Sequence, residues 1–212
     1  MVLTPELKIF LISTHFVPFL LIPIIIWSMS KRKEYLSEKM NSVFIYQLGL
    51  VSIIIALISE VSWHYFVQNW IYTNDIHILN MLMYLFMNIG FTLMNLGIKR
   101  TKFLDESLLI SSLLTPVVYY LGIKEIIWVI QLIGLIAITV NAKKVLKDNL
   151  VYLFPIFSFV VNMIFIMLLF QTDNPIYHIF HDIFGTLLGF AILGYAFWRN
   201  PKQELKIEKK HD

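Results

Sequence analysis

The chain of 212 residues contains no cysteine. Disulfide bonds and thiolate metal sites are therefore excluded, and a bound metal ion would have to be held by histidine, aspartate, glutamate or water. Charged residues are also scarce, because they make up 15% of the sequence, whereas a soluble domain carries about a quarter. Hydrophobic residues account for 58%. This composition indicates an integral membrane protein.

Several functional motifs are missing as well. The sequence has no glycine-rich phosphate loop and no nucleophile elbow. No lysine lies near the middle of the last apolar segment, which disfavours a retinal Schiff base. The first apolar stretch is followed by a basic loop rather than by a small-residue cleavage site, so we expect no cleavable signal peptide.

Long apolar runs make up most of the chain. Most are close to the length of about 20 residues that a helix needs to cross a hydrocarbon core of about 30 Å. The fourth and fifth are shorter, and only a tight turn at 122–124 separates them. We therefore predict an all-α seven-transmembrane-helix bundle with spans near 8–29, 42–66, 76–98, 107–122, 125–141, 151–171 and 176–198.

The basic residues predict the orientation of this bundle. They gather in alternate loops and after the last span, while the loops at 68–74 and 172–176 have none. Because short cytoplasmic loops carry the excess of lysine and arginine, we expect the N-terminus outside and the C-terminus in the cytoplasm. The basic residues are Lys31, Arg32, Lys33, Lys39, Lys99, Arg100, Lys102, Lys143, Lys144, Lys147, Arg199, Lys202, Lys206, Lys209 and Lys210.

The net charge of +3 therefore reflects membrane topology, and we expect no nucleic-acid partner. We predict one transmembrane domain over residues 1–198 and a short basic cytoplasmic tail over 199–212. The membrane is expected to be a plasma (inner) membrane of the bacterial type.

Histidines are concentrated at the predicted outer end of the bundle. Two acidic residues, Glu60 and Asp182, lie with them inside apolar segments, and Asp75 lies at the mouth of the third span. Ionisable groups within spans are costly, so they indicate a functional site by default. Five of the six histidines belong to this group, namely His15, His64, His77, His178 and His181.

Helical spacing brings several of these side chains together. Glu60 and His64 are four residues apart and share one helix face. His178 precedes His181 by three residues and Asp182 by four, so all three share a face of the last span. Two histidines one turn apart can chelate one ion, and a neighbouring carboxylate can fix a ring tautomer.

Structural explanations compete with this hypothesis. Asp75 suits a helix N-cap, and His77 can point to water or to lipid headgroups. His64 can reach the headgroups, and Glu60 can pair with a buried donor. His15, a lone histidine about two turns inside the first span, can simply bond a neighbouring helix.

With these residues the chain resembles the alkaline ceramidase branch of the membrane hydrolase superfamily that also contains the adiponectin-receptor-like proteins. Those proteins have seven spans, a serine four residues before a histidine in span 2, a following aspartate, and His-x-x-x-His at the start of span 7. The resemblance implies that three histidines hold zinc while the serine and the aspartate flank the bound water. His64, Asp75 and His181 match three of these five positions.

The chain departs from that pattern at two positions. Glu60 stands in place of the serine, and Tyr177 stands in place of the first histidine of span 7, with His178 offset by one residue. A residue three rather than four positions before His181 still reaches the same helix face, with changed geometry.

Our leading hypothesis is a zinc-dependent hydrolase of amide- or ester-linked membrane lipids, with its site near the outer face. His64, His178 and His181 would hold Zn²⁺. With one coordination position open, the water bound there has a pKa of about 7. Glu60 or Asp75 would transfer the proton. The supporting residues around them would be Asp182, Tyr177, His77 and His15.

Two alternatives use the same residues. A non-catalytic membrane sensor or ligand-binding protein is favoured if Glu60 occupies the open position on the metal. A haem-binding electron-transfer protein would need two axial histidines, for which His15 with His64 or His181 is suitable.

Overall fold

The computed structural model describes residues 5–67, 76–99 and 101–208. Every regular element within these ranges is a helix. In chain order the elements are α1 (Pro5–Ser30), α2 (Lys33–Ser37), α3 (Val43–Val67), α4 (Ile78–Ile98), α5 (Lys102–Tyr120), α6 (Lys124–Leu146), η1 (Asn149–Tyr152), α7 (Leu153–Pro155), η2 (Ile156–Val161), α8 (Asn162–Thr172), α9 (Ile176–Phe180), η3 (His181–Leu187) and α10 (Leu188–Glu208).

The seven predicted spans correspond to seven helical segments, which confirms the all-α membrane fold. In the described part of the chain, six segments are long and apolar enough to cross a membrane: Ile9–Ser30, Val43–Phe66, Ile78–Ile98, Lys124–Leu146, Asn149–Thr172 and Ile176–Arg199. The seventh segment is α5, a helix of 19 residues whose first turns carry charge. The orientation of the termini across the membrane stays a prediction, as does the division at residue 198.

Both short predicted spans prove longer in the structure. α5 begins five residues before the predicted start, and α6 ends five residues after its predicted end. The reason is that their polar ends are buried and bonded within the bundle. Asn95 donates to Asp105 over 3.0 Å, and Asn141 donates to Asn95 over 2.7 Å. These contacts let charged and amide side chains lie inside helices whose ends resemble loops in the sequence.

The same polar seam continues along α4 and α5. Asn88 donates to Thr115 over 2.8 Å, and the hydroxyls of Thr92 and Ser112 lie 2.9 Å apart. All four side chains are buried. Hydrogen bonds between helices replace water in a bilayer, so this seam explains how the least apolar of the seven helices joins the bundle.

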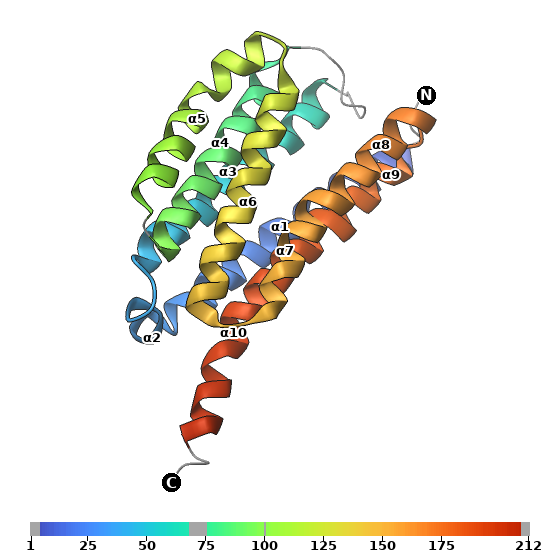
Figure 1. Cartoon of the computed structure of the whole chain (residues 1–212). Coiled ribbons are helices and arrows are strands. Elements are labelled where there is room, and N and C mark those ends of the chain that lie inside the picture. The colour runs from blue at the N-terminus through green and yellow to red at the C-terminus, as the bar shows by residue number, and fades with distance from the viewer. Residues whose placement is uncertain (1–4, 68–75, 100, 209–212) are drawn as a thin grey trace.

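The helices form two groups that meet around one apolar core. In Figure 1, α3 to α6 lie on one side, and α1 lies with α7 to α10 on the other. Their shared core includes Ile25 of α1, Leu50 of α3, Met94 of α4, Phe154 of α7 and Phe190 of α10. It occupies the half of the bundle nearer the basic loops, which leaves the opposite half to the histidines.

Close packing of α3 on α4 depends on glycine. A Cβ at Gly49 would lie 2.7 Å from both the carbonyl oxygen of Gly90 and the amide nitrogen of Met94. Backbone atoms of a packed helix cannot move aside as the end of a side chain can. A side chain at residue 49 would therefore force α3 and α4 apart. At Gly134 of α6, by contrast, the nearest atom to an added Cβ is the Cβ of Phe91 at 3.1 Å.

We therefore predict that Gly49→Ala lowers stability by about 2 kcal/mol, the usual cost of overpacking. Gly134→Ala is the matched control and should cost less than about 1 kcal/mol, because the clash is milder and alanine favours a helix. Thermal unfolding of the detergent-solubilised protein measures both. Equal melting temperatures for the two variants would contradict the role assigned to Gly49.

An ion pair at the basic end of the bundle ties the middle of α10 to the turn before η1. Arg199 donates from Nε and Nη2 to the two carboxylate oxygens of Asp148, over 2.8 and 2.7 Å. Asp148 also accepts from the amide of Leu150 over 2.9 Å and so caps η1. Burial alone would raise the pKa of Asp148, but the bonds from Arg199 and Leu150 outweigh it and lower that pKa below its ordinary value.

Asp148→Asn should destabilise the protein by about 1–2 kcal/mol, a figure reduced for the partial exposure of Arg199. Because the pKa of Asp148 is lower in the folded state, its contribution is fully present above about pH 4. It is lost as the pH falls through the folded value. Unfolding at pH 5 to 8 should therefore show a constant difference from the wild type that shrinks below about pH 4.

Asp173→Asn is the matched control for this prediction. Asp173 is an exposed aspartate with a positive φ of 50°, a conformation that asparagine tolerates. Its substitution should leave stability unchanged across the same pH range. A pH-independent cost for Asp148→Asn that persists below pH 4 would contradict the ion-pair explanation.

Candidate functional site

Four buried side chains from three spans converge near one end of the bundle. His15 comes from α1, Glu60 and His64 from α3, and His178 from α9. Each offers one ligand atom, and these four atoms all lie within 4.8 Å of one another. None of the four residues is more than 6% exposed. Such a set of imidazoles and a carboxylate is one that zinc favours.

The three imidazole rings form a compact triangle. Their ring centroids lie 5.1 Å apart for His15 and His64, 4.8 Å for His64 and His178, and 5.0 Å for His15 and His178. The Nε2 atoms of His15 and His178 are 3.2 Å apart. Two nitrogens bound to one tetrahedral zinc at about 2.05 Å would lie about 3.3 Å apart, so this spacing suits a shared ion as well as a hydrogen bond.

A second carboxylate orients the ring of His15. Asp182 Oδ2 lies 3.1 Å from His15 Nδ1 and accepts a hydrogen bond of 2.8 Å from Thr14. The same Nδ1 is 2.7 Å from the carbonyl oxygen of Leu11. Because both neighbours of Nδ1 are acceptors, we assign the proton to Nδ1. That tautomer leaves the lone pair of Nε2 directed at the four-residue cluster, as a carboxylate–histidine pair does at metal sites.

The other oxygen of Asp182 contacts a further histidine. His181 Nδ1 lies 3.1 Å from Asp182 Oδ1, and His178, His181 and Asp182 make up a second group with ligand atoms within 4.8 Å. His178 therefore belongs to both groups. Asp182 connects α1 to the last span through His15 and Thr14 on one side and His181 on the other.

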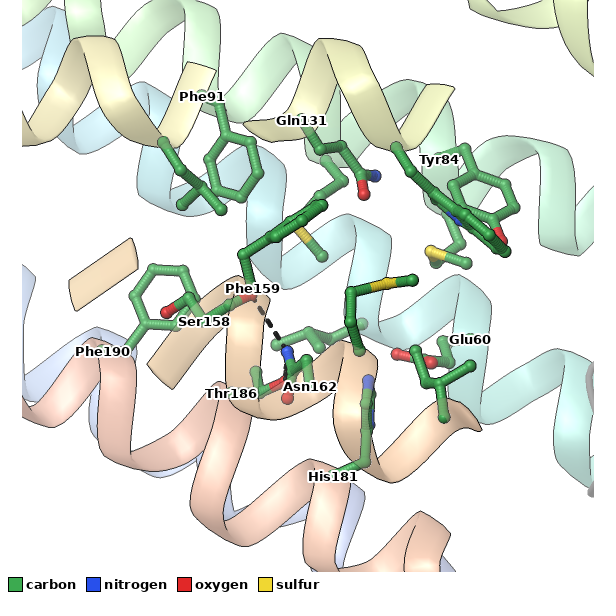
Figure 2. A pocket seen from close by; sticks show the side chains of 17 residues that line it. Glu60, Tyr84, Phe91, Gln131, Ser158, Phe159, Asn162, His181, Thr186 and Phe190 are labelled. Carbon is green, nitrogen blue, oxygen red and sulfur yellow. Dashed lines mark hydrogen bonds between the residues drawn. The ribbon is translucent and has the colours of Figure 1, made fainter. Parts of the chain in front are cut away.

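A cavity of about 100 Å³, measured as the space open to the centres of water-sized molecules, lies beside the cluster. Aromatic and methionine side chains of α4 and α6 line one wall, and η2, α8 and η3 line another. In Figure 2, Glu60 and His181 extend into it toward one end, while Ser158 and Phe190 lie toward the other. Its polar lining residues are Glu60, Gln131, Ser158, Asn162, His181 and Thr186.

Comparison with known protein families assigns the chain to one of them. The family model described as "Seven transmembrane receptor" matches residues 7–203, which is nearly the whole chain. The chain belongs to this seven transmembrane receptor family. The match supports the seven-helix architecture and does not extend to the ceramidase and adiponectin-receptor superfamily. Searches of curated proteins and of solved structures gave no match.

In this family member, the predicted metal ligands divide between the two groups. His64 and His178 lie together as expected, but the other members of their group are His15 and Glu60, while His181 is grouped with Asp182. The sequence predicts only a supporting role for His15, because it is the one candidate in its span. The missed signal was the shared depth of two residues, since His15 and Glu60 both lie two to three turns from the helix ends at this side of the bundle.

The remaining predicted residues have other surroundings. His77 is the N-cap of α4, because its Nδ1 accepts from the amide of Leu79 over 3.2 Å. It therefore takes the capping role that the sequence suggested for Asp75, which lies outside the described residues. The half-buried ring of Tyr177 packs against Phe180, with ring centroids 6.3 Å apart.

Two π-helices, η2 and η3, pack against one another beside the cavity. A Cβ at Gly185 would lie 1.2 Å from Oδ1 of Asn162, so the asparagine side chain fills the space that glycine leaves. Asn162 donates to the carbonyl oxygen of Ser158 over 3.1 Å. Gly185 thus permits close packing of η3 against α8. π-Helical turns occur often at functional sites.

Gly185→Ala should force Asn162 out of its position and lower stability by about 1–2 kcal/mol. In an Asn162→Ala background, the same glycine substitution should cost much less, because the clashing amide is gone. The double-mutant cycle should thus show a coupling of about 1 kcal/mol or more. Additive effects in thermal unfolding would mean that the two side chains do not compete for this space.

Proposed function

We propose that this protein is a non-catalytic membrane sensor or ligand-binding protein whose buried centre holds Zn²⁺ through His15, Glu60, His64 and His178. The observation that carries the proposal is the convergence of four ligand atoms within 4.8 Å. Zinc sites with four protein ligands are closed, whereas catalytic sites keep one position for water or substrate. Membership in a family of seven transmembrane receptors supports the same reading.

The surroundings of the four residues fit a cation. Glu60 is 6% exposed within a span, where a carboxylate is costly unless a positive charge compensates it. The imidazole tautomer assigned to His15 offers a lone pair rather than a proton to the centre. Asp182 would supply the outer contact that keeps this ring in place.

Zinc at this position would join three spans. His15 lies on α1, Glu60 and His64 on α3, and His178 on α9, so binding would favour helix arrangements in which all three meet. A ligand shifts a conformational equilibrium by the difference between its affinities for the two states. Metal occupancy would thereby be coupled to the packing of α1 and the last span against α3.

A hydrolase of amide- or ester-linked membrane lipids is the second candidate. The cavity favours it, because Glu60 lines a space whose walls are mainly apolar and aromatic. In that case Glu60, with Asp75, would transfer protons, and the histidines alone would hold the metal. The two candidates therefore differ in the role of Glu60.

Haem binding does not suit His15 with His64. Two axial histidines bind the iron from opposite faces and must be far enough apart to enclose the porphyrin. The ring centroids of His15 and His64 lie only 5.1 Å apart.

We expect one zinc ion per chain in the purified protein, measured by elemental analysis after dialysis against trace zinc. Replacing His15, His64, His178 or Glu60 by alanine should weaken zinc binding at least 10-fold, because each removes a ligand. Asp182→Asn should weaken it by about 10–100-fold through the ring of His15. His77→Asn is the control, since it keeps a helix cap at the same end of the bundle.

Glu60→Ala distinguishes the two candidates. The four-ligand sensor is supported if Glu60→Ala loses zinc and the wild type hydrolyses no lipid. The hydrolase is supported, and the sensor overturned, if Glu60→Ala keeps its full zinc content and loses a lipid hydrolysis that the wild type shows. Equal zinc content in the wild type, His64→Ala and His178→Ala would overturn the centre itself.

A further inference from the structure

Glu60 belongs to two sites at once. Its carboxylate is one of the four clustered ligand atoms, and the same side chain lines the cavity. Among the described residues that line the cavity, it is the one acidic side chain. Figure 2 shows it extending from α3 toward the space that also receives His181. A molecule in the cavity and a metal in the cluster would therefore meet the same carboxylate.

The polar groups at this end of the cavity accept hydrogen bonds. Glu60 is a carboxylate. His181 directs Nδ1 at Asp182 over 3.1 Å, so the proton is assigned to Nδ1 and Nε2 is left as an acceptor. Two acceptors that line one cavity select a ligand head that donates, and the negative charge of Glu60 selects a cation.

The rest of the lining is apolar and aromatic. Tyr84, Trp128, Phe91 and Phe159 surround the space, together with methionines of α4. Aromatic faces attract cations as well as apolar groups, and methionine adapts to ligands of different shape. The cavity therefore offers an apolar wall for the body of a ligand and a cation-binding end at Glu60.

The volume limits the size of the ligand. About 100 Å³ is open to the centres of water-sized molecules, and one such group needs about 10–15 Å³ on this measure. The space therefore limits an enclosed ligand to fewer than about ten non-hydrogen atoms. A primary amine with an apolar body of seven or eight carbons has this size.

We propose that the cavity binds a small amphiphilic primary amine whose ammonium group pairs with Glu60, and that this amine and zinc antagonise one another. The antagonism rests on the proposed zinc centre. The cause is electrostatic, because a zinc ion on Glu60 would withdraw the negative charge that attracts the ammonium and would repel it at close range. Coupling between two ligands is reciprocal, so each should weaken the other by the same factor.

Heptylamine and heptanol are the matched probes, since they share size and apolar body and differ in charge. Binding is followed by the intrinsic fluorescence of Trp128 in metal-stripped, detergent-solubilised protein, with Trp128→Phe as the signal control. Heptylamine should bind saturably, and Glu60→Gln should weaken it at least 10-fold while changing heptanol binding less than threefold. Glu125→Gln, at the exposed start of α6 and not among the residues that line the cavity, should change neither.

Two further measurements test the coupling and the location. Saturating zinc should raise the apparent Kd of heptylamine at least 10-fold and leave that of heptanol within threefold. Met87→Trp, which fills the cavity from α4, should abolish amine binding while zinc content stays at one ion per chain. That variant thus separates failure of the amine site from failure of the zinc centre.

Equal affinities for heptylamine and heptanol, both insensitive to Glu60→Gln, would overturn the amine site. Amine binding that depends on Glu60 but does not respond to bound zinc would overturn the antagonism. If the protein binds no zinc while Glu60-dependent amine binding persists, the zinc centre fails and the amine site stands.

Discussion

Asp182 is the contact on which this end of the bundle depends. It lies in the last span, is 5% exposed, and reaches Thr14 and His15 of α1 as well as His181 in its own span. A carboxylate in an apolar span is costly unless it is fully bonded. Its partners therefore have to remain together, and they hold α1 against the last span at one depth and one rotation.

The two groups of helices satisfy their buried polar side chains in different ways. Between α4, α5 and α6, buried amides and hydroxyls pair along the helices, and Asp105 is held by Asn95 and by the amide of Thr101. Between α1, α3 and the last span, the buried polar groups are mainly ionisable. Amides and hydroxyls satisfy one another without a cation, whereas imidazoles gathered around a carboxylate form a set that can bind one. This difference separates a structural seam from a candidate site.

The sequence predicted the number of helical segments well, because long apolar runs and alternating basic loops reflect the thickness and the charge asymmetry of a bilayer. It underestimated the lengths of α5 and α6. Asp105 and Asn141 can lie inside these helices because both bond Asn95 of α4, and the length and composition of a segment do not reveal such a partner. The capping of α4 by His77 was also missed, because it depends on the conformation of the backbone there.

The candidate site was foreseen in part for a related reason. A period of 3.6 residues groups His178, His181 and Asp182 on one face, but the helix changes from α to π at His181. A π-turn contains one more residue than an α-turn. Side chains that follow therefore point in directions that the α period does not predict. Which histidine meets His64 also depends on how α1 rotates, and its buried contacts with Asp182 determine that rotation.

In the proposed centre, the fourth ligand would matter more than the other three. Three histidines around an ion leave one position open, and such a site activates water. A carboxylate in this position would stop that chemistry and keep a negative charge that a second ligand could use. Because Glu60 also lines the cavity, the residue that would close the metal site is also the one that a molecule in the cavity would meet. Glu60 in place of the serine of the ceramidase pattern would therefore change which ligands the site can respond to, and not only its catalytic competence.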